Sequence, residues 1–226
     1  MAEFRYPQFC PLARAAEILG ERWTLLVLRE LACGPQRFSD LRRRLSGVST
    51  SVLSERLNRL EERGLVARRS QPPPAPAQLY ELTADGEALR PTLYQLMRFG
   101  VRFLDTGSPG DHLEADWLRV GLAAFARAEP LPRHTIAIYL PAGASELVLR
   151  VISGRQGTRI DSGPGPAEAV LRIEPLTLLA LLARQLDPLE AAAAGSLELD
   201  GDRAALLALP DLFDLDDLIA RPARTG

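Results

Sequence analysis

The sequence feature that most restricts the possible folds of this chain is a leucine repeat in its N-terminal half. In the run STSVLSERLNRLEERG, which begins at Ser49, the residues Leu53, Leu57 and Leu60 recur at spacings of four and three. That spacing lines one side of an α-helix. Ser49 stands where an N-cap side chain accepts a backbone N–H, and Gly64 stands where a left-handed residue ends a helix. The sequence therefore predicts a helix with defined ends and one apolar face.

A further helix is predicted directly before this one. In RFSDLRRRL the apolar residues Phe38, Leu41 and Leu45 share one face, and SGVS follows as a short turn. Two helices joined by a short turn that contains glycine form a helix-turn-helix pattern. The outer face of the earlier helix is then expected to carry Arg42, Arg43 and Arg44.

The flanking segments extend this pattern to a winged helix. PLARAAEIL and RWTLLVLRELAC predict two earlier helices, and LVARR and QLYELT predict two short strands. SQPPPAP joins the strands, and because proline cannot donate ladder hydrogen bonds it suits the tip of an exposed hairpin. An interdomain linker is the alternative interpretation of the prolines. A long helix is predicted from near Thr83 through ADGEALRPTLYQLMRFGVRFL.

Charge is distributed unevenly along the 226 residues, whose formal net charge is −2. Residues 1–104 contain 16 Arg against 11 Asp or Glu, whereas residues 105–226 contain 11 Arg against 18 Asp or Glu. Such asymmetry suggests two modules with different partners. The turn-forming run DTGSPGD predicts a linker at 105–111, between an N-terminal domain at 1–104 and a C-terminal domain at 112–226.

The run from Asp40 to Arg69 holds eight arginines against four carboxylates, and together with the helix-turn-helix it predicts binding to double-stranded DNA. A helix that enters the major groove needs polar side chains opposite its apolar seam. Arginines around it can meet phosphates. The alternatives are a solvated helix face with internal salt pairs and a basic module that docks on acidic membranes. The candidates for base edges are Thr50, Ser51, Ser54, Asn58 and Arg59, and those for phosphates are Arg42, Arg43, Arg44, Arg68 and Arg69.

The N-terminal half resembles the HxlR-type winged helix-turn-helix regulators, relatives of the MarR group. The segments CPL, LGERWTLLVLREL, GPQRFSDLRRRL, LSERLNRLEERGLV and YELTADGEAL carry the resemblance in order. It implies a homodimeric bacterial transcription factor that dimerises through the N-terminal segment and the helix after the wing. It also makes Cys10 a candidate redox sensor, for which packing at a dimer interface is the alternative. Gln78 departs from the basic residue usual in family wings.

The acidic half alternates helices and strands. LEADWLRVGLAAFAR predicts an amphipathic helix, and HTIAIYL, ELVLRVIS, QGTRIDSG and EAVLRIEP predict strands of a meander-like sheet. PLTLLALLARQL predicts a helix that is apolar nearly all round and therefore buried on more than one side. PLEAAAAG, the strand SLELDGD and a last helix RAALLALPDLF follow. The fold class predicted for the whole chain is α+β, with a mostly antiparallel sheet in the C-terminal domain.

This half resembles the sterol-carrier-protein-like lipid-binding fold, most strongly over residues 168–213. The resemblance implies an apolar tunnel that binds fatty acyl or sterol-like molecules. The run Ala191–Ala194 is expected to leave volume unfilled beside it, and an ordinary filled core is the equal alternative. The candidate ligand-binding residues are Leu178, Leu179, Leu182 and Leu186.

Other chemistry receives little support from the sequence. We expect no catalytic site, no metal site and no cofactor, because the two cysteines and two histidines show no ligand or triad spacing. No apolar run reaches the roughly 20 residues of a membrane span, and a cytoplasmic location is expected. The interpretation is a transcriptional regulator controlled by an apolar molecule. The alternatives are a regulator with a purely structural C-terminal domain that senses redox at Cys10, and a lipid carrier recruited to acidic membranes.

Overall fold

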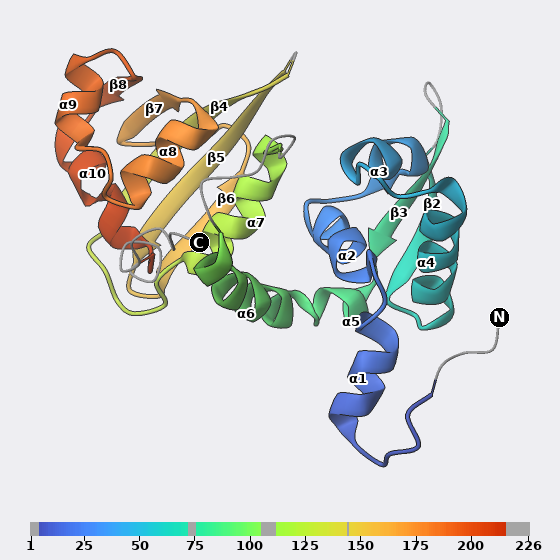
Figure 1. Ribbon diagram of the computed structural model, residues 1–226. Coiled ribbons are helices and arrows are strands. Elements are labelled where there is room, and N and C mark those ends of the chain that lie inside the picture. The colour runs from blue at the N-terminus through green and yellow to red at the C-terminus, as the bar shows by residue number, and fades with distance from the viewer. Residues whose placement is uncertain (1–4, 72–75, 105–111, 144, 216–226) are drawn as a thin grey trace, which may run out of the picture. The chain divides into compact units, whose positions relative to one another are not determined.

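The chain folds into two compact units, Met1–Leu93 and Tyr94–Gly226. The computed structural model describes residues 5–71, 76–104, 112–143 and 145–215, coloured from blue to red in Figure 1. The division falls inside a helix rather than in a loop. The segment 105–111, predicted as the linker, lies outside the described residues.

The helices of the first unit follow the predicted apolar runs. Leu41, Leu53 and Leu57 are fully buried, and burying a leucine stabilises a fold by about 1.5–3 kcal/mol. Ser49 caps the leucine-seam helix, its side chain accepting from the backbone N of Val52 at 3.3 Å. The helices are α1 (Pro11–Leu19), α2 (Thr24–Ala32), α3 (Phe38–Arg44) and α4 (Thr50–Glu62).

The predicted wing is an antiparallel hairpin of β2 (Val66–Gln71) and β3 (Ala77–Leu82). Its tip, residues 72–75, lies outside the described residues. A two-residue strand that sequence analysis did not predict, β1 (Gln36–Arg37), pairs antiparallel with β3 on the other side. The winged-helix prediction is therefore confirmed, with one extra short strand in the sheet.

The prediction of one continuous helix after the wing is wrong. The structure instead has α5 (Ala84–Glu87), then α6 (Arg90–Gly100), then the 3₁₀ turn η1 (Val101–Phe103). Pro91 explains the interruption, because proline has no N–H to donate and its ring clashes with the carbonyl four residues earlier. The α5 helix is a single turn capped by the Thr83 side chain, which accepts from Gly86 N at 3.1 Å.

The second unit is built on a five-stranded sheet of order β6-β5-β4-β7-β8. Neighbouring strands are antiparallel except β4 and β7, which are parallel, so the mostly antiparallel prediction is confirmed. The meander holds only for the first three strands, because the chain then crosses over to place β7 beside β4. The strands are β4 (His134–Ala142), β5 (Ser145–Gly154), β6 (Gly157–Ser162), β7 (Ala169–Ile173) and β8 (Leu197–Gly201).

Helices cover one face of this sheet and form a single core with it. Leu118 and Leu122 from α7 join Ile138 of β4 and Leu149 of β5 in that core. The expectation that α8 is buried on more than one side is only partly met, because Leu176 is 70% exposed. The helical elements are α7 (Ala115–Phe125), α8 (Pro175–Leu182), α9 (Pro188–Ala193), α10 (Arg203–Ala208) and the 3₁₀ turn η2 (Leu209–Leu212).

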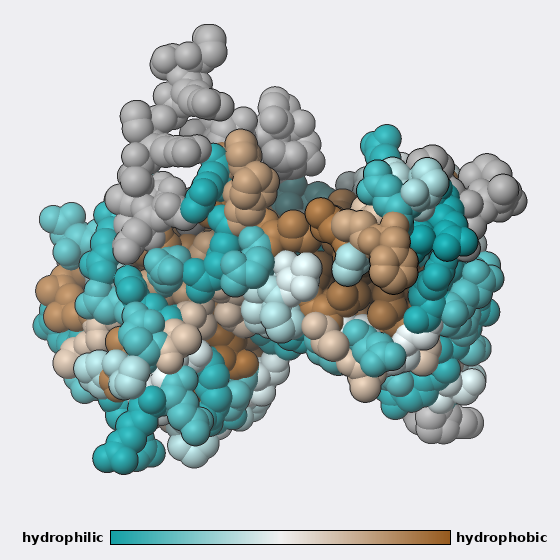
Figure 2. Space-filling view, turned by 90° about the horizontal axis from the view of Figure 1, so that it is seen from below, coloured by the Kyte–Doolittle hydropathy of each residue, from teal (hydrophilic) through white to brown (hydrophobic). Residues whose placement is uncertain are grey.

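Some large apolar side chains remain on the surface, which shows brown apolar areas between hydrophilic ones in Figure 2. Phe9 and Leu12 are exposed at the start of the first unit, and Phe99 and Phe103 are exposed in α6 and η1. Across the described residues, no helix combines the length and the apolar character that crossing a membrane requires.

Candidate nucleic-acid interface

The turn between α3 and α4 is fixed by glycine and by a tryptophan from an earlier segment. Gly47 has a φ of +89°, a conformation that residues with a Cβ adopt at a steric cost. A Cβ added there would lie 3.7 Å from Cη2 of Trp23. Trp23 itself precedes α2 with a φ of +78°, an outlier for a bulky residue. The helix-turn-helix angle thus rests on a turn that packs against Trp23.

The first turn of α4 presents hydroxyl groups away from the leucine seam. Thr50 and Ser51 are exposed, Ser54 is half-buried, and Asn58 is exposed further along. Ser49 Oγ and Ser51 Oγ lie 3.1 Å apart. Hydroxyl and amide groups can donate to and accept from base edges in the major groove. Three of the predicted base-contacting residues, Thr50, Ser51 and Asn58, are thus exposed, and base contact by all four stays a prediction.

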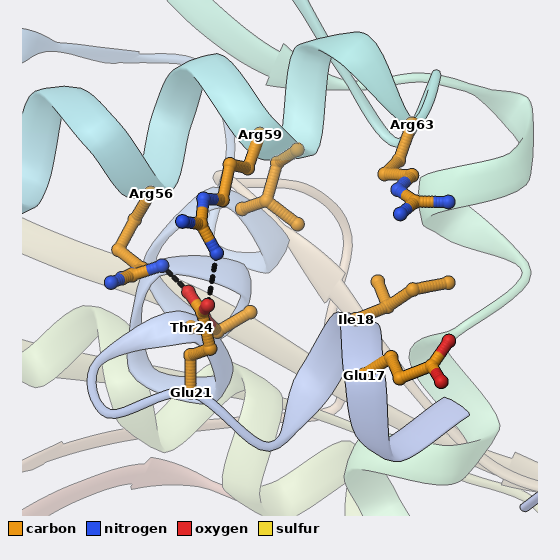
Figure 3. A pocket seen from close by; sticks show the side chains of 8 residues that line it. Glu17, Ile18, Glu21, Thr24, Arg56, Arg59 and Arg63 are labelled. Carbon is orange, nitrogen blue, oxygen red and sulfur yellow. Dashed lines mark hydrogen bonds and ion pairs between the residues drawn. The ribbon is translucent and has the colours of Figure 1, made fainter. Parts of the chain in front are cut away.

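Arg59 does not lie on this outer face, contrary to the expectation for base contact. Its guanidinium turns toward the α1–α2 connection, where it pairs with Glu21, and Nη2 lies 2.8 Å from Glu55 Oε1. Figure 3 shows Arg59 and Arg56 both directed at the Glu21 carboxylate. Sequence reasoning missed Arg56 and Glu21, because a pair separated by 35 residues leaves no mark in local periodicity. The inner flank of α4 is thus tied to the preceding helices.

Arg56 is the more enclosed of the two arginines. Its side chain is 12% exposed and pairs with Glu21, and it lies 3.6 Å from Glu55. Burial, with the nearby positive charge of Arg59, lowers the pKa of Arg56 from its usual high value. Arginine remains charged at neutral pH, so Glu21 neutralises positive charge that the fold would otherwise hold partly buried and uncompensated.

The prediction that Arg44 lies on the outer face of α3 with Arg42 and Arg43 is also wrong. Its side chain is only 13% exposed, and Nη1 lies 3.7 Å from Oε2 of Glu30, whose side chain is fully buried. Arg29 Nη2 donates to the other oxygen of Glu30 at 2.6 Å. A buried carboxylate is stable only when paired. Arg44 therefore serves the core between α2 and α3, whereas Arg42 and Arg43 are exposed.

The remaining basic candidates lie at the end of α3 and on the wing. Within the described residues Arg42 has no ion-pair partner, and Arg43 lies 3.8 Å from Asp40. On β2, Arg69 is 3.0 Å from Glu81 across the hairpin and stays 56% exposed. Arg68 Nη2 donates to Asn58 Oδ1 at 2.6 Å. The arrangement brings a hydroxyl-rich helix start together with exposed arginines on either side of it in the sequence.

Comparison with known proteins agrees with this arrangement. The model of the HxlR-like helix-turn-helix family matches residues 18–108. The chain is 35% identical over 105 residues to the uncharacterised HTH-type transcriptional regulator sll1512 of Synechocystis, which covers 46% of this chain and 78% of that protein. It is 38% identical over 100 residues to the uncharacterised regulator YvaP of Bacillus subtilis, covering 43% and 92%. The chain belongs to the HxlR-like helix-turn-helix family.

This HxlR-like protein is thus a helix-turn-helix transcriptional regulator by family. Among solved structures, the reduced form of the regulator YodB from B. subtilis is 30% identical with a TM-score of 0.39, over 45% of this chain and 100% of that one. The model of the SCP-2 sterol transfer family matches residues 119–214. Both predicted family resemblances are confirmed.

The leucines predicted to bind a ligand lie in or against the core of the SCP-2-like unit. Leu178 and Leu182 are fully buried in this core, and the half-buried Leu179 and Leu186 pack against it. The small-residue run does not face the core throughout, because only Ala191 is buried and Ala193 and Ala194 are exposed. An apolar interior site at these leucines remains a prediction.

Cys10, the redox candidate, is the residue that precedes α1 in the N-cap position. It is half-buried, forms no disulfide, and its side chain makes no capping hydrogen bond. The structure therefore places this thiol at a helix start, and a redox role stays a prediction.

Proposed function

We propose that this HxlR-like protein is a homodimeric regulator that reads a specific DNA sequence with the first turn of α4. The observation that carries the proposal is the Ser49-capped helix whose leucine seam is buried and whose opposite side exposes Thr50 and Ser51. An α-helix presented in this way fits the major groove of B-DNA. Ser54 and Asn58 extend the same side by one turn each.

Phosphate contacts are assigned to the arginines that remain exposed. Arg42 and Arg43 end α3, and Arg69 lies on the wing. Arg68 joins them only after it releases Asn58 and Glu61. Arg44 and Arg59 are excluded from this role, because acidic residues of the fold hold their guanidiniums. They position the interface instead.

The homodimer is proposed from the apolar side chains left in water. Phe9 is fully exposed and Leu12 is 76% exposed, while Phe99 and Phe103 are 60% and 62% exposed. Exposed apolar clusters on a soluble protein mark sites of association. Replacement of Phe9 and Leu12 by Ser should shift sedimentation toward the monomer, with Leu176→Ser, exposed on α8, as the control.

An apolar small molecule bound by the SCP-2-like unit is proposed to modulate DNA affinity. The helix α6 supports such coupling, because a hydrogen bond within the first unit holds its start and a hydrogen bond within the second unit holds its end. Arg90 donates to Ala32 O at 3.0 Å in the first unit, and Arg98 donates to Ala124 O at 2.6 Å in the second. A ligand that changes DNA affinity must have its own affinity changed by DNA by the same factor.

The test is selection of DNA from a randomised duplex library by the full chain. We expect enrichment of a palindrome whose half-sites lie about one helical turn apart. The double variant Thr50→Ala with Ser54→Ala should lose that enrichment, while Ser196→Ala, exposed in the second unit, should keep it. A library that emerges unenriched with the wild-type chain would overturn sequence-specific binding. Ligand control is then measured as operator affinity with and without a fatty acid, and fatty-acid affinity with and without operator.

A further inference from the structure

The five-stranded sheet has a second face that its helices leave open. Side chains alternate along each strand, so Val151 of β5 faces the helical core while Arg150 and Ile152 face the other way. The register places Thr135 of β4 beside Ile152, and Ile152 beside Arg159 of β6. These residues are half-buried or exposed, whereas their core-facing neighbours are fully buried.

A groove of about 620 Å³ lies on this open face. Four arginines line it, Arg133, Arg150, Arg155 and Arg159, and none of the described residues that line it carries a carboxylate. Leu131, Ile152 and Pro166 supply apolar surface to the same groove. Small-molecule sites fall in this size range and combine apolar walls with a few convergent polar groups.

Arg150 lines the groove and is contacted by the chain that crosses from β6 to β7. A Cβ added to Gly165 would lie 3.0 Å from Arg150 Nη1 and 3.1 Å from its Nε, so this backbone rests on the guanidinium. Arg150 Nη2 donates to Asp161 Oδ2 at 3.2 Å. Its Nε is buried and has no hydrogen-bond partner among the described residues. The guanidinium is therefore fixed in place between the Gly165 backbone and Asp161.

Positive charge in the groove is only partly neutralised. Asp161 serves both Arg150 and Arg159, at 3.2 Å and 3.5 Å. Arg133 and Arg155 have no ion-pair partner in the described ranges. Glu168, at the end of the crossover, is not among the lining residues of the groove, and its Oε1 lies 2.6 Å from His134 Nδ1. Four guanidiniums against one shared carboxylate leave a net positive site.

We infer that this groove binds an amphiphilic anion, with a carboxylate or phosphate head on the arginines and a short apolar body over Ile152 and Leu131. Guanidinium groups bind these two heads through paired N–H donors. The site lies on the opposite face of the sheet from the leucines considered above. It rests on the proposed control by a small molecule and deepens it, since it names an anionic ligand class and a location.

The probe is decanoate, with the uncharged 1-decanol as its partner, titrated calorimetrically into the full chain without DNA. We expect decanoate to bind and decanol to bind much more weakly. Arg133→Ala with Arg155→Ala should weaken decanoate binding by about tenfold for each guanidinium removed from the head group. Both side chains are exposed, so the double variant should have the same melting temperature as the wild type. The control is Arg172→Ala, an arginine of the same face that pairs with Glu146 outside the groove.

The head group has two natural sources, which vesicles separate. Binding to phosphatidylglycerol vesicles but not phosphatidylcholine vesicles, abolished in the double variant, would assign the head group to a membrane lipid and still support the groove. Equal decanoate binding by wild type and double variant would overturn the inference, as would equal binding of decanoate and decanol. A double variant that loses DNA affinity without decanoate would make the groove a phosphate contact, which also overturns it. Because binding is measured without DNA, failure of DNA regulation leaves this result unaffected.

Discussion

Arg68 on the wing and Asn58 on α4 are joined by a hydrogen bond in which Arg68 Nη2 donates to Asn58 Oδ1 at 2.6 Å. Arg68 Nε also lies 3.0 Å from Glu61 Oε2, and its guanidinium stands 5.4 Å from the Tyr80 ring centroid. An asparagine that reads adenine uses its amide oxygen and its amide nitrogen together. Such a contact therefore shares the Asn58 amide oxygen with Arg68 or displaces Arg68 from it.

Asn58→Ala and Arg68→Ala should consequently affect DNA binding in different ways. Removal of the Asn58 amide should reduce the preference for operator over random DNA by about 1–3 kcal/mol, because the alanine cannot hydrogen-bond to a base. Removal of the Arg68 guanidinium should lower the affinity for operator and random DNA by the same factor, because a phosphate contact carries no sequence information. Fluorescence anisotropy with labelled operator and random duplexes measures both quantities. A parallel drop on both DNAs for Asn58→Ala would remove it from base reading.

The exposed pair at the end of α3 should govern the salt dependence of binding. Each phosphate contact releases counterions, so Arg42→Ala with Arg43→Ala should make the slope of log K against log salt shallower by roughly 0.9 for each arginine that binds a phosphate. The matched control is Arg172→Ala with Arg203→Ala, which removes the same charge from the second unit. If both double variants change the slope equally, net charge rather than local phosphate binding explains the effect.

Glu21 should matter for stability more than an exposed glutamate does. Glu21→Gln removes the carboxylate that Arg56 and Arg59 share, and leaves their charges facing Glu55 alone. We expect the free energy of unfolding to fall by about 1–3 kcal/mol. Glu62→Gln, exposed at the end of α4, should change it by less than about 0.5 kcal/mol. Urea denaturation measures both, and equal effects would show that the Glu21 cluster is no more than a surface ion pair.

Gly86 and Gly121 should respond in opposite directions to alanine. A Cβ at Gly86 would lie 2.1 Å from the Leu65 carbonyl oxygen, a backbone atom that cannot swing aside. Gly86→Ala should therefore destabilise the chain by about 1–3 kcal/mol. A Cβ at Gly121 in α7 meets nothing within 4 Å, so Gly121→Ala should stabilise by up to about 1 kcal/mol through helix propensity. Thermal unfolding distinguishes these signs, and a neutral Gly86→Ala would mean that the α5 turn yields easily.

The local sequence pattern determined those elements that have a single apolar face and defined capping residues. Leu53, Leu57 and Leu60 predicted the face of α4, and Ser49 and Gly64 predicted its ends, because spacing and capping depend on residues within a few positions. The same holds for the longer strands of both units, whereas the two-residue strand β1 was not predicted. The break before Pro91 could also have been predicted from the sequence, because proline disrupts the interior of a helix. The helical spacing of apolar residues on both sides of Pro91 led instead to the prediction of one continuous helix.

Tertiary structure alone decided which charges face outward. Arg42 and Arg44 are two positions apart in one arginine run, yet one is exposed and the other pairs with the buried Glu30. Arg59 turns inward to Glu21, 38 residues away in the sequence. The return of β7 beside β4 likewise set where Pro166 lies against the groove arginines. Periodicity assigns a residue to a face, but Coulomb energy and desolvation depend on partners that only the folded chain brings within a few ångströms.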